Sequence, residues 1–229
     1  DIIRALHQII AESLEPSEIA EAKDDRRYDI SRIDFDRLRK EFERSPSKKT
    51  ATLTLKEMLE SRLQKMLALN PKRADFQKHY EDIVAAYNSE KDRATIERTF
   101  EELLKLAESL SGEEKRAVRE GLDEKSLALF DLLQKPDLSK ADIARIKKVA
   151  VGLYQTLTDE IARIQDFASK QATRDEIKVC IKDYLWDEKT GLPESFAPEE
   201  IDEKTDAVFA HLLTSVRHHT WQMSQDMGI

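Results

Sequence analysis

The chain is poor in the residues that build tight loops. Among 229 residues it has six prolines and only five glycines, scattered at positions 112, 121, 152, 191 and 228. The Walker A pattern G-x-x-x-x-G-K-[ST] is absent. A phosphate-binding loop needs clustered glycines, because its backbone amides approach the phosphate closely. The sequence therefore predicts no nucleotide-binding loop in this chain.

Cysteine and long apolar runs are also scarce. Cys180 is the single thiol, so no internal disulfide can form, and such rarity is typical of the reducing cytosol. We therefore expect a cytoplasmic protein and interpret Cys180 as a buried, unreactive thiol on the apolar face of a helix. No apolar run approaches the roughly 18–20 residues of a membrane span, so no membrane partner is expected.

Basic residues are outnumbered by acidic ones, 38 against 46, which gives a formal net charge of −8. A chain of this charge does not attract DNA through its summed field, so DNA binding is not its expected main task. Basic residues at predicted helix ends remain candidates for a local DNA contact: Lys48, Lys49, Lys72 and Arg73. The basic run 145–148 is interpreted as the solvated edge of a helix, with a contact to phosphate or an acidic partner as the alternative.

What the chain does have is apolar and charged residues arranged with helical spacing. Apolar residues recur every three or four positions, which places them on one face of a helix. The cleanest stripe follows Ser139 over about 26 residues: Ile143, Ile146, Ala150, Leu153, Leu157, Ile161, Ile164 and Ala168. No stretch shows the sustained alternation of a strand. We predict an all-α, multi-helix bundle of about nine or ten mostly antiparallel helices and no sheet.

Local signals bound several of these helices. Asp123 and Ser126 are both suitable N-caps for a helix that Pro136 ends, because the proline ring disfavours helical angles in the preceding residue. Ser139 and Asp142 then open the long helix, as an N-cap and a first-turn acid.

Two further segments have capping-box spacing, 111–114 and 173–176. The first indicates either the start of a short helix ending at Gly121 or a bend in a continuous helix, and the second predicts a helix start before Ile177. Gly152 is expected to weaken the long helix by up to about 1 kcal/mol relative to alanine.

The expected organisation has three parts. Residues 1–30 form an N-terminal helix and a charged connector, 31–217 form a helical domain, and 218–229 form a tail. A division of the helical domain into two sub-bundles that meet near 111–122 is one arrangement. Because the chain begins with Asp1 rather than Met, we expect it to be a piece of a longer protein.

Three segments carry a resemblance to a known family. They are IDFDRLRKEFER at Ile33–Arg44, LQKMLALNPKRADFQKHYEDIVAAYN at Leu63–Asn88, and EGLDEKSLALFDLLQKPDLSKADIARIKKVA at Glu120–Ala150. In this order they resemble the C-terminal region of the R (restriction and motor) subunit of type I restriction–modification enzymes. The likeness covers most of the chain, from Ile33 to Arg217.

The resemblance implies a non-catalytic helical assembly domain that follows the motor domain. The domain would dock the R subunit, which translocates and cleaves DNA, onto the modification (methyltransferase) subunits. Those subunits and the rest of the R subunit are the expected partners, and DNA is contacted indirectly. The parent, a type I site-specific deoxyribonuclease, would use ATP and Mg, and this piece no cofactor. Candidate partner-binding residues lie in the last helix and tail: Phe209, Leu213, Trp221 and Met223.

Some residues imitate catalytic or metal-binding motifs. Asp137 and Glu176–Lys178 imitate the Asp and Glu-x-Lys of the family's nuclease, but we reject the match because such a tripeptide arises easily in a chain rich in Glu and Lys. His211 and His218 could share a helix face, although surface histidines are more common there than metal ligands.

The two tryptophans are also ambiguous. Trp186 and Trp221 each lie at or beyond a helix end, where they either anchor a partner or fold back on the chain's own helices. The alternative functions are a DNA-contacting accessory domain of the same motor and an unrelated helical scaffold.

Overall fold

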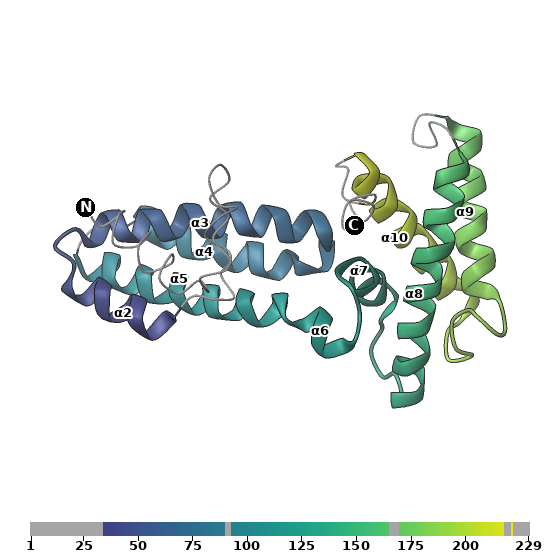
Figure 1. Ribbon diagram of the computed structural model, residues 1–229, viewed down its shortest axis with the longest axis horizontal. Helices are drawn as coiled ribbons and strands as arrows, with labels where there is room; N and C mark the ends of the chain where they lie inside the picture. Colours follow the sequence, from purple (N-terminus) through teal and green to yellow (C-terminus); the bar gives the residue numbers. More distant parts are fainter. Residues whose placement is uncertain (1–33, 90–92, 165–169, 218–220, 222–229) are drawn as a thin grey trace, which may run out of the picture. The chain divides into compact units, whose positions relative to one another are not determined.

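The computed structural model describes residues 34–89, 93–164, 170–217 and 221 (Figure 1). Within these ranges the secondary structure is helical and contains no strand. The helices are α2 (Phe35–Arg44), α3 (Lys48–Leu69), α4 (Ala74–Ser89), α5 (Arg93–Glu114), α6 (Arg116–Glu120), α7 (Glu124–Leu133), α8 (Lys140–Arg163), α9 (Gln171–Trp186) and α10 (Pro198–Arg217), with a 3-10 turn at Pro71–Arg73.

The predicted all-α class is confirmed. Eight of the described helices have ten residues or more and α6 has five, so the count of substantial helices is slightly below the predicted nine or ten. The helix expected near 2–14 lies outside the described residues.

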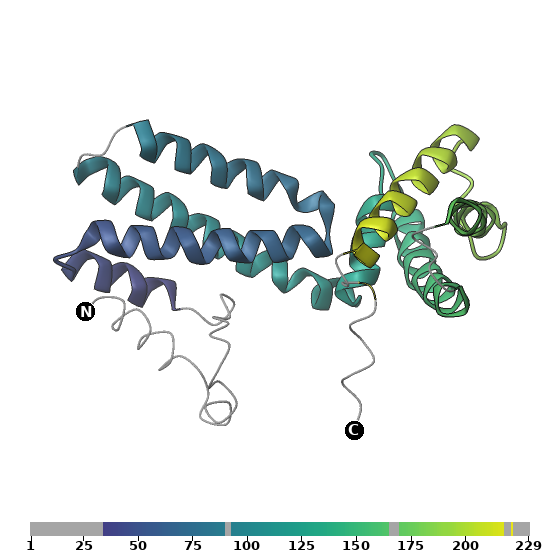
Figure 2. The same cartoon turned by 90° about the horizontal axis from the view of Figure 1, so that it is seen from above.

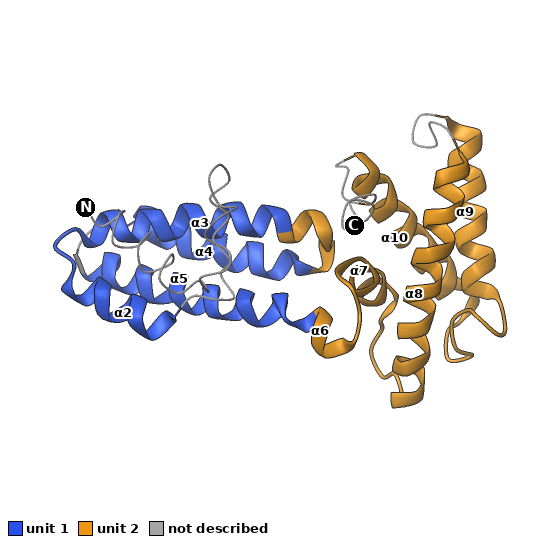
Figure 3. Cartoon of the chain, in the orientation of Figure 1, with its two compact units in different colours: residues 1–65, 73–116 blue, residues 66–72, 117–229 orange. Residues whose placement is uncertain are grey.

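The chain divides into two compact units, coloured separately in Figure 3. Unit 1 comprises residues 1–65 and 73–116, and unit 2 comprises residues 66–72 and 117–229. Each unit has its own arrangement of helices and its own buried residues.

Unit 1 is built on three long helices, α3, α4 and α5, which run alternately back and forth (Figures 1 and 2). Helix α2 packs on α5, where the rings of Phe42 and Phe100 stack with centroids 3.6 Å apart. Leucines of α3 at four-residue spacing, Leu55, Leu59 and Leu63, are buried because this spacing keeps them on one helical face.

Charged side chains also join the helices of unit 1. Nε of Arg73, whose side chain is only 3 % exposed, lies 3.0 Å from a carboxylate oxygen of Glu113 on α5. Arg62 on α3 pairs with Glu114, which like Glu113 belongs to α5. Arg39 on α2 reaches Glu101 of α5 at 3.2 Å. Ion pairs therefore connect α2, α3 and the 3-10 turn to α5.

Unit 2 is a ring of four packed helices. Helix α7 contacts α8, α8 contacts α9, α9 contacts α10, and α10 returns to α7. Their inward faces form one apolar core, whose members include Leu127, Phe130, Ile146, Leu153, Leu157, Ile177, Ile181, Val208 and Leu212. The stripe predicted after Ser139 supplies the α8 side of this core.

Helix starts in unit 2 follow the capping signals in part. Asp123 is the N-cap of α7, and its carboxylate accepts from the backbone N–H groups of Lys125 and Ser126 at 2.9 and 3.0 Å. Ser126 lies inside α7 instead of capping it. Ser139 and Asp142 form a reciprocal capping box at the start of α8, as the sequence indicated.

Two local predictions are wrong. The capping box predicted at 173–176 does not form: α9 begins at Gln171, before Ile177, and Thr173 lies in its first turn, where its hydroxyl donates to the Lys170 carbonyl at 2.9 Å. Helix α8 ends at Arg163, where Ile164 is extended, whereas the stripe predicted it to Ala168. At 111–114 the structure agrees with the second of the two alternatives, because α5 continues through Ser111 and Gly112 to Glu114 and α6 follows after a break of one residue.

Gly152 has a packing role in α8. A Cβ added there would lie 2.0 Å from the hydroxyl oxygen of Tyr184 on α9. The missing side chain therefore makes room for Tyr184 and lets α8 and α9 pack closely at this point.

Candidate functional site: a docking surface on α9 and α10

The outer side of α9 carries exposed apolar residues. Val179 is 57 % exposed and Trp186 is 50 % exposed, and the two are seven residues, or two turns, apart. Ile177, Ile181 and Leu185 on the other side of α9 are buried in the core of unit 2. Helix α9 therefore buries one apolar side in the core of unit 2 and exposes a second apolar stripe, Val179 and Trp186.

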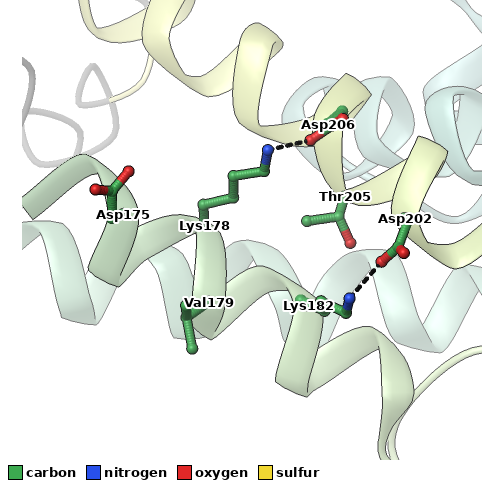
Figure 4. A pocket seen from close by; sticks show the side chains of 7 residues that line it. All are labelled: Asp175, Lys178, Val179, Lys182, Asp202, Thr205 and Asp206. Carbon is green, nitrogen blue, oxygen red and sulfur yellow. Dashed lines mark ion pairs between the residues drawn. The ribbon is translucent and has the colours of Figure 1, made fainter. Parts of the chain in front are cut away.

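Two ion pairs connect this helix to α10 (Figure 4). Nζ of Lys178 lies 2.6 Å from Asp206, and Nζ of Lys182 lies 2.6 Å from Asp202. The spacing is four residues on both helices, so the pairs form successive rungs. The hydrogen bond to Asp206 raises the pKa of Lys178. Because all four side chains are about half exposed, these pairs contribute little stability and mainly position surface charge.

Shallow hollows lie beside the stripe. One of about 440 Å³ lies between α9 and α10 and is lined by Val179, Thr205 and the residues of both rungs (Figure 4). A second of about 410 Å³ is lined by Lys182, Asp183, Trp186 and Asp187. A third of about 520 Å³ is also lined by Trp186, together with residues that include Leu192 and Phe196. We call the stripe with these three hollows the α9–α10 face.

The loop after α9 is held in place by specific contacts. The carboxylate of Asp187 accepts from the N–H groups of Lys189 and Thr190 at 2.9 and 2.7 Å, and these bonds lower the pKa of Asp187. Arg145 of α8 donates to the carbonyls of Gly191 and Glu188 at 2.9 and 2.6 Å. The basic run 145–148 thus includes an arginine that fixes this loop beside Trp186.

The start of α10 is anchored similarly. Glu200 accepts from Nζ of Lys135 and from the N–H of Ala197, at 2.6 and 2.8 Å. The bond from Lys135 is the main cause that lowers the pKa of Glu200. Both ends of the connection between α9 and α10 are therefore fixed.

The predicted partner-binding residues have different positions. Phe209 and Leu213 are half buried on α10 and pack against the core cluster. They follow Asp206 by three and seven residues and therefore continue its side of α10. Trp221 is only 3 % exposed and its ring centroid lies 4.9 Å from that of Tyr154, so it packs on the chain's own helices. Met223 lies outside the described residues.

The predicted DNA-contact residues do not form one basic patch. Lys48, at the start of α3, pairs with Glu97 at 2.6 Å and lies over the Phe42 ring. Arg73 is buried against Glu113. Lys49 and Lys72 are exposed, at the first turn of α3 and in the 3-10 turn after its last residue. Two of the four cations are thus already paired inside unit 1.

The groups weighed as metal or nuclease ligands also have other surroundings. His211 is buried in α10, and burial lowers its pKa to about 4. His218 lies outside the described residues. Lys178 pairs with Asp206, and Asp137 lies in a turn with a φ of 62°. Within the described ranges, no three His, Cys, Asp or Glu side chains are grouped to hold a metal ion.

The remaining sequence-level candidate is Cys180. It is half buried on α9, and burial raises the pKa of its thiol.

None of the described helices is long and apolar enough to cross a membrane.

Comparison with known protein families gives the family of this helical chain. The chain belongs to the family described as "Type I restriction enzyme HindI endonuclease subunit-like, C-terminal", which matches residues 1–216. No curated protein and no solved structure gives a significant match. The resemblance predicted from three segments is confirmed, and the unrelated scaffold has no support.

Sequence reasoning missed Val179 and the two ion-pair rungs. Val179 does not fit the core stripe of α9, and it shares a face with Trp186 seven residues later. That out-of-phase pair was the available signal. The pairing of Lys178 and Lys182 with α10 had no such signal, because it depends on the packing of two helices.

Proposed function

We propose that this chain is a non-catalytic assembly domain of a type I restriction R subunit. In this role it docks the ATP-dependent, DNA-translocating and DNA-cleaving subunit onto the modification (methyltransferase) subunits. Membership of the R-subunit family supplies the context of a restriction complex. The observation that carries the docking role is the exposed stripe of Val179 and Trp186 on a rigid helix.

The physical basis is burial of this stripe by a partner. Half-exposed Trp and Val side chains gain free energy when a partner removes them from water, and a tryptophan in a concave surface is the typical hot spot of an interface. The anchored loop and the capped helices add to this, because a pre-organised surface loses little entropy on binding. Phe209 and Leu213 extend the candidate surface along α10.

The direct test is co-elution of the purified chain with the modification subunits of its own restriction system, in size-exclusion chromatography at micromolar concentration. We expect a stable complex. Val179→Asp should weaken it, because the new charge would be buried in the contact. Val118→Asp is the matched control, since Val118 is 83 % exposed on α6 and α6 lines none of the three hollows. A chain that never co-elutes overturns the proposal.

The absence of catalysis is tested separately. The purified chain should neither hydrolyse ATP nor nick plasmid DNA in the presence of magnesium. Either activity, retained through purification on two different columns, would contradict the assignment of catalysis to the rest of the parent enzyme.

A DNA-contacting role is the second candidate. Within unit 2, Lys72 lies near enough to Lys204 to lower the pKa of Lys204, although burial is the larger cause. Two neighbouring cations can contact DNA phosphates, and such binding weakens steeply as salt rises. Lys72→Glu should then reduce DNA affinity and flatten the salt dependence, with Lys49→Glu as the comparison. If the chain does not bind duplex DNA at low salt, this role is removed.

A further inference from the structure

We infer that the α9–α10 face binds a basic amphipathic helix and that an Arg or Lys of this helix packs on the Trp186 ring. The inference rests on the proposed docking function and adds the chemistry of the partner segment. Three observations carry it: the charge around the α9–α10 face, the Trp186 ring on which no described cation packs, and the spacing of Val179 and Trp186.

The charge on the face favours a cationic partner. Seven carboxylates and four cations line its three hollows. Two of the cations, Lys178 and Lys182, are already paired with aspartates of α10. A third, Arg145, is engaged with two backbone carbonyls. Seven carboxylates against four cations leave the face with a formal excess of three negative charges, and Asp183 lies beside Trp186, so an added positive charge would complement this surface.

Trp186 differs from the other aromatic rings in its relation to cations. Four rings of the chain, those of Phe42, Phe130, Tyr154 and Phe196, each have a lysine over them at 4.5 to 5.8 Å. Within the described residues no cation lies over Trp186, although indole attracts cations more strongly than the other rings. The half-exposed Trp186 lines two hollows, so a long side chain from a partner can reach its ring.

The spacing of the stripe fits a helix laid along α9. Val179 and Trp186 are seven residues apart, about 10 Å along the helix axis. A partner helix with apolar residues at positions i and i+7 presents contacts at the same interval, and basic residues beside them would face the carboxylates. An extended strand would present its side chains at a different spacing.

The experiment measures the affinity of the chain for the modification subunits of its own system by titration, at salt concentrations from about 50 to about 300 mM. Trp186→Ala should weaken binding about 30-fold, as expected for a hot-spot tryptophan, and Trp186→Phe should retain part of the affinity. Asp183→Lys should weaken binding about 3- to 10-fold and reduce its salt dependence. The matched control is Asp82→Lys, an exposed aspartate within α4 of unit 1, which should change neither.

Tryptophan fluorescence gives a second readout. Trp186 is half exposed and Trp221 is buried, and they are the only tryptophans in the sequence. Acrylamide should quench Trp186 in the free chain and lose access to it in the complex. In the Trp186→Phe chain, the remaining signal of Trp221 should show no such protection.

The outcomes separate the two proposals. If the unaltered chain does not bind the modification subunits, the docking function fails and the inference fails with it. If the chain binds but Trp186→Ala has the affinity of the unaltered chain, docking stands and the α9–α10 face is overturned as its site. If Trp186→Ala weakens binding while Asp183→Lys strengthens it, the face is correct but the basic chemistry of the partner is wrong.

Discussion

The two units differ in the side-chain contacts that join their helices and in the apolar side chains that they leave exposed. Unit 1 turns charged side chains toward its own helices: Arg73 is buried against Glu113, and Arg39 and Arg62 pair with glutamates of α5. Unit 2 closes an apolar core with capped helices and leaves Val179 and Trp186 outside. The only comparable exposed residue described in unit 1 is Leu53, at 37 %.

The two kinds of contact differ in what they leave available for a partner. A buried ion pair requires good geometry from both partners, so it fixes the register of the helices that it joins. An exposed tryptophan beside a pre-organised loop contributes little until a partner covers it. The described part of unit 1 thus leaves less apolar side-chain surface exposed than that of unit 2.

The largest effect is expected from the charged interior of unit 1. Glu113→Ala removes the carboxylate that faces both Arg73 and Arg116 and should lower the free energy of unfolding by about 3–5 kcal/mol. Glu97→Ala, on the same helix, removes the half-exposed partner of Lys48 and should cost no more than about 1 kcal/mol. Urea denaturation followed by circular dichroism measures both. Equal losses would show that burial of the pair is unimportant.

A pH-dependent effect should be confined to unit 2. Burial lowers the pKa of His211 to about 4, so the unfolded chain binds the extra proton between about pH 6.5 and 4. Stability is therefore lost as the pH falls through this window, by about 3 kcal/mol in total.

The urea midpoint from tryptophan fluorescence reports this loss, because both tryptophans belong to unit 2. His211→Leu should flatten the profile above pH 4. Asp123 and Glu200, whose pKa values are lowered in the folded state, affect stability at still lower pH. A His211→Leu profile as steep as that of the unaltered chain would contradict the assignment.

The contact between α8 and α9 gives an intermediate effect. Gly152→Ala places a methyl group against the Tyr184 hydroxyl and should destabilise unit 2 by about 1–3 kcal/mol. In a Tyr184→Phe chain the same change meets only the ring carbon, 3.3 Å away, and should therefore cost less than in the unaltered chain. The double-mutant cycle is measured by thermal denaturation. Additive effects would show that the close approach carries no strain.

The smallest effects separate real caps from apparent ones. Ser139→Ala and Asp123→Ala each remove an observed N-cap and should cost about 1 kcal/mol. Thr173→Ala should change stability by less than about 0.5 kcal/mol, because Thr173 lies within the first turn of α9 and is not its N-cap. Thermal midpoints of the three variants test this order, and a larger loss for Thr173→Ala would reverse our boundary for α9.

Local patterns were reliable where the physics is local. The stripe after Ser139 and the capping box with Asp142 depend on residues within a turn or two of each other, and both appear in α8. The same spacing misled at Thr173, because it also fits the interior of a helix and α9 already begins at Gln171. Capping motifs predict a helix start only where the preceding residue is free to leave the helix.

The candidate site depended on distant contacts. Trp186 and Trp221 have similar settings in the sequence, yet Trp221 packs on Tyr154 and Trp186 remains half exposed. Lys178 and Lys182 could be assigned to an exposed helical face, but their aspartate partners are on another helix. Spacing within one element does not reveal which side chains arrive from another.

The family and the all-helical class were accessible from residue order alone, because helical periodicity and the three matching segments are properties of neighbouring positions. Tertiary packing determines which side chains meet. It brings Asn70 within 2.6 Å of Asp131, sixty-one positions away, and it buries Trp221 while Trp186 stays exposed. Such pairings arise only when whole helices meet, since each helix can satisfy its own backbone in several arrangements and the shape of the shared core selects among them.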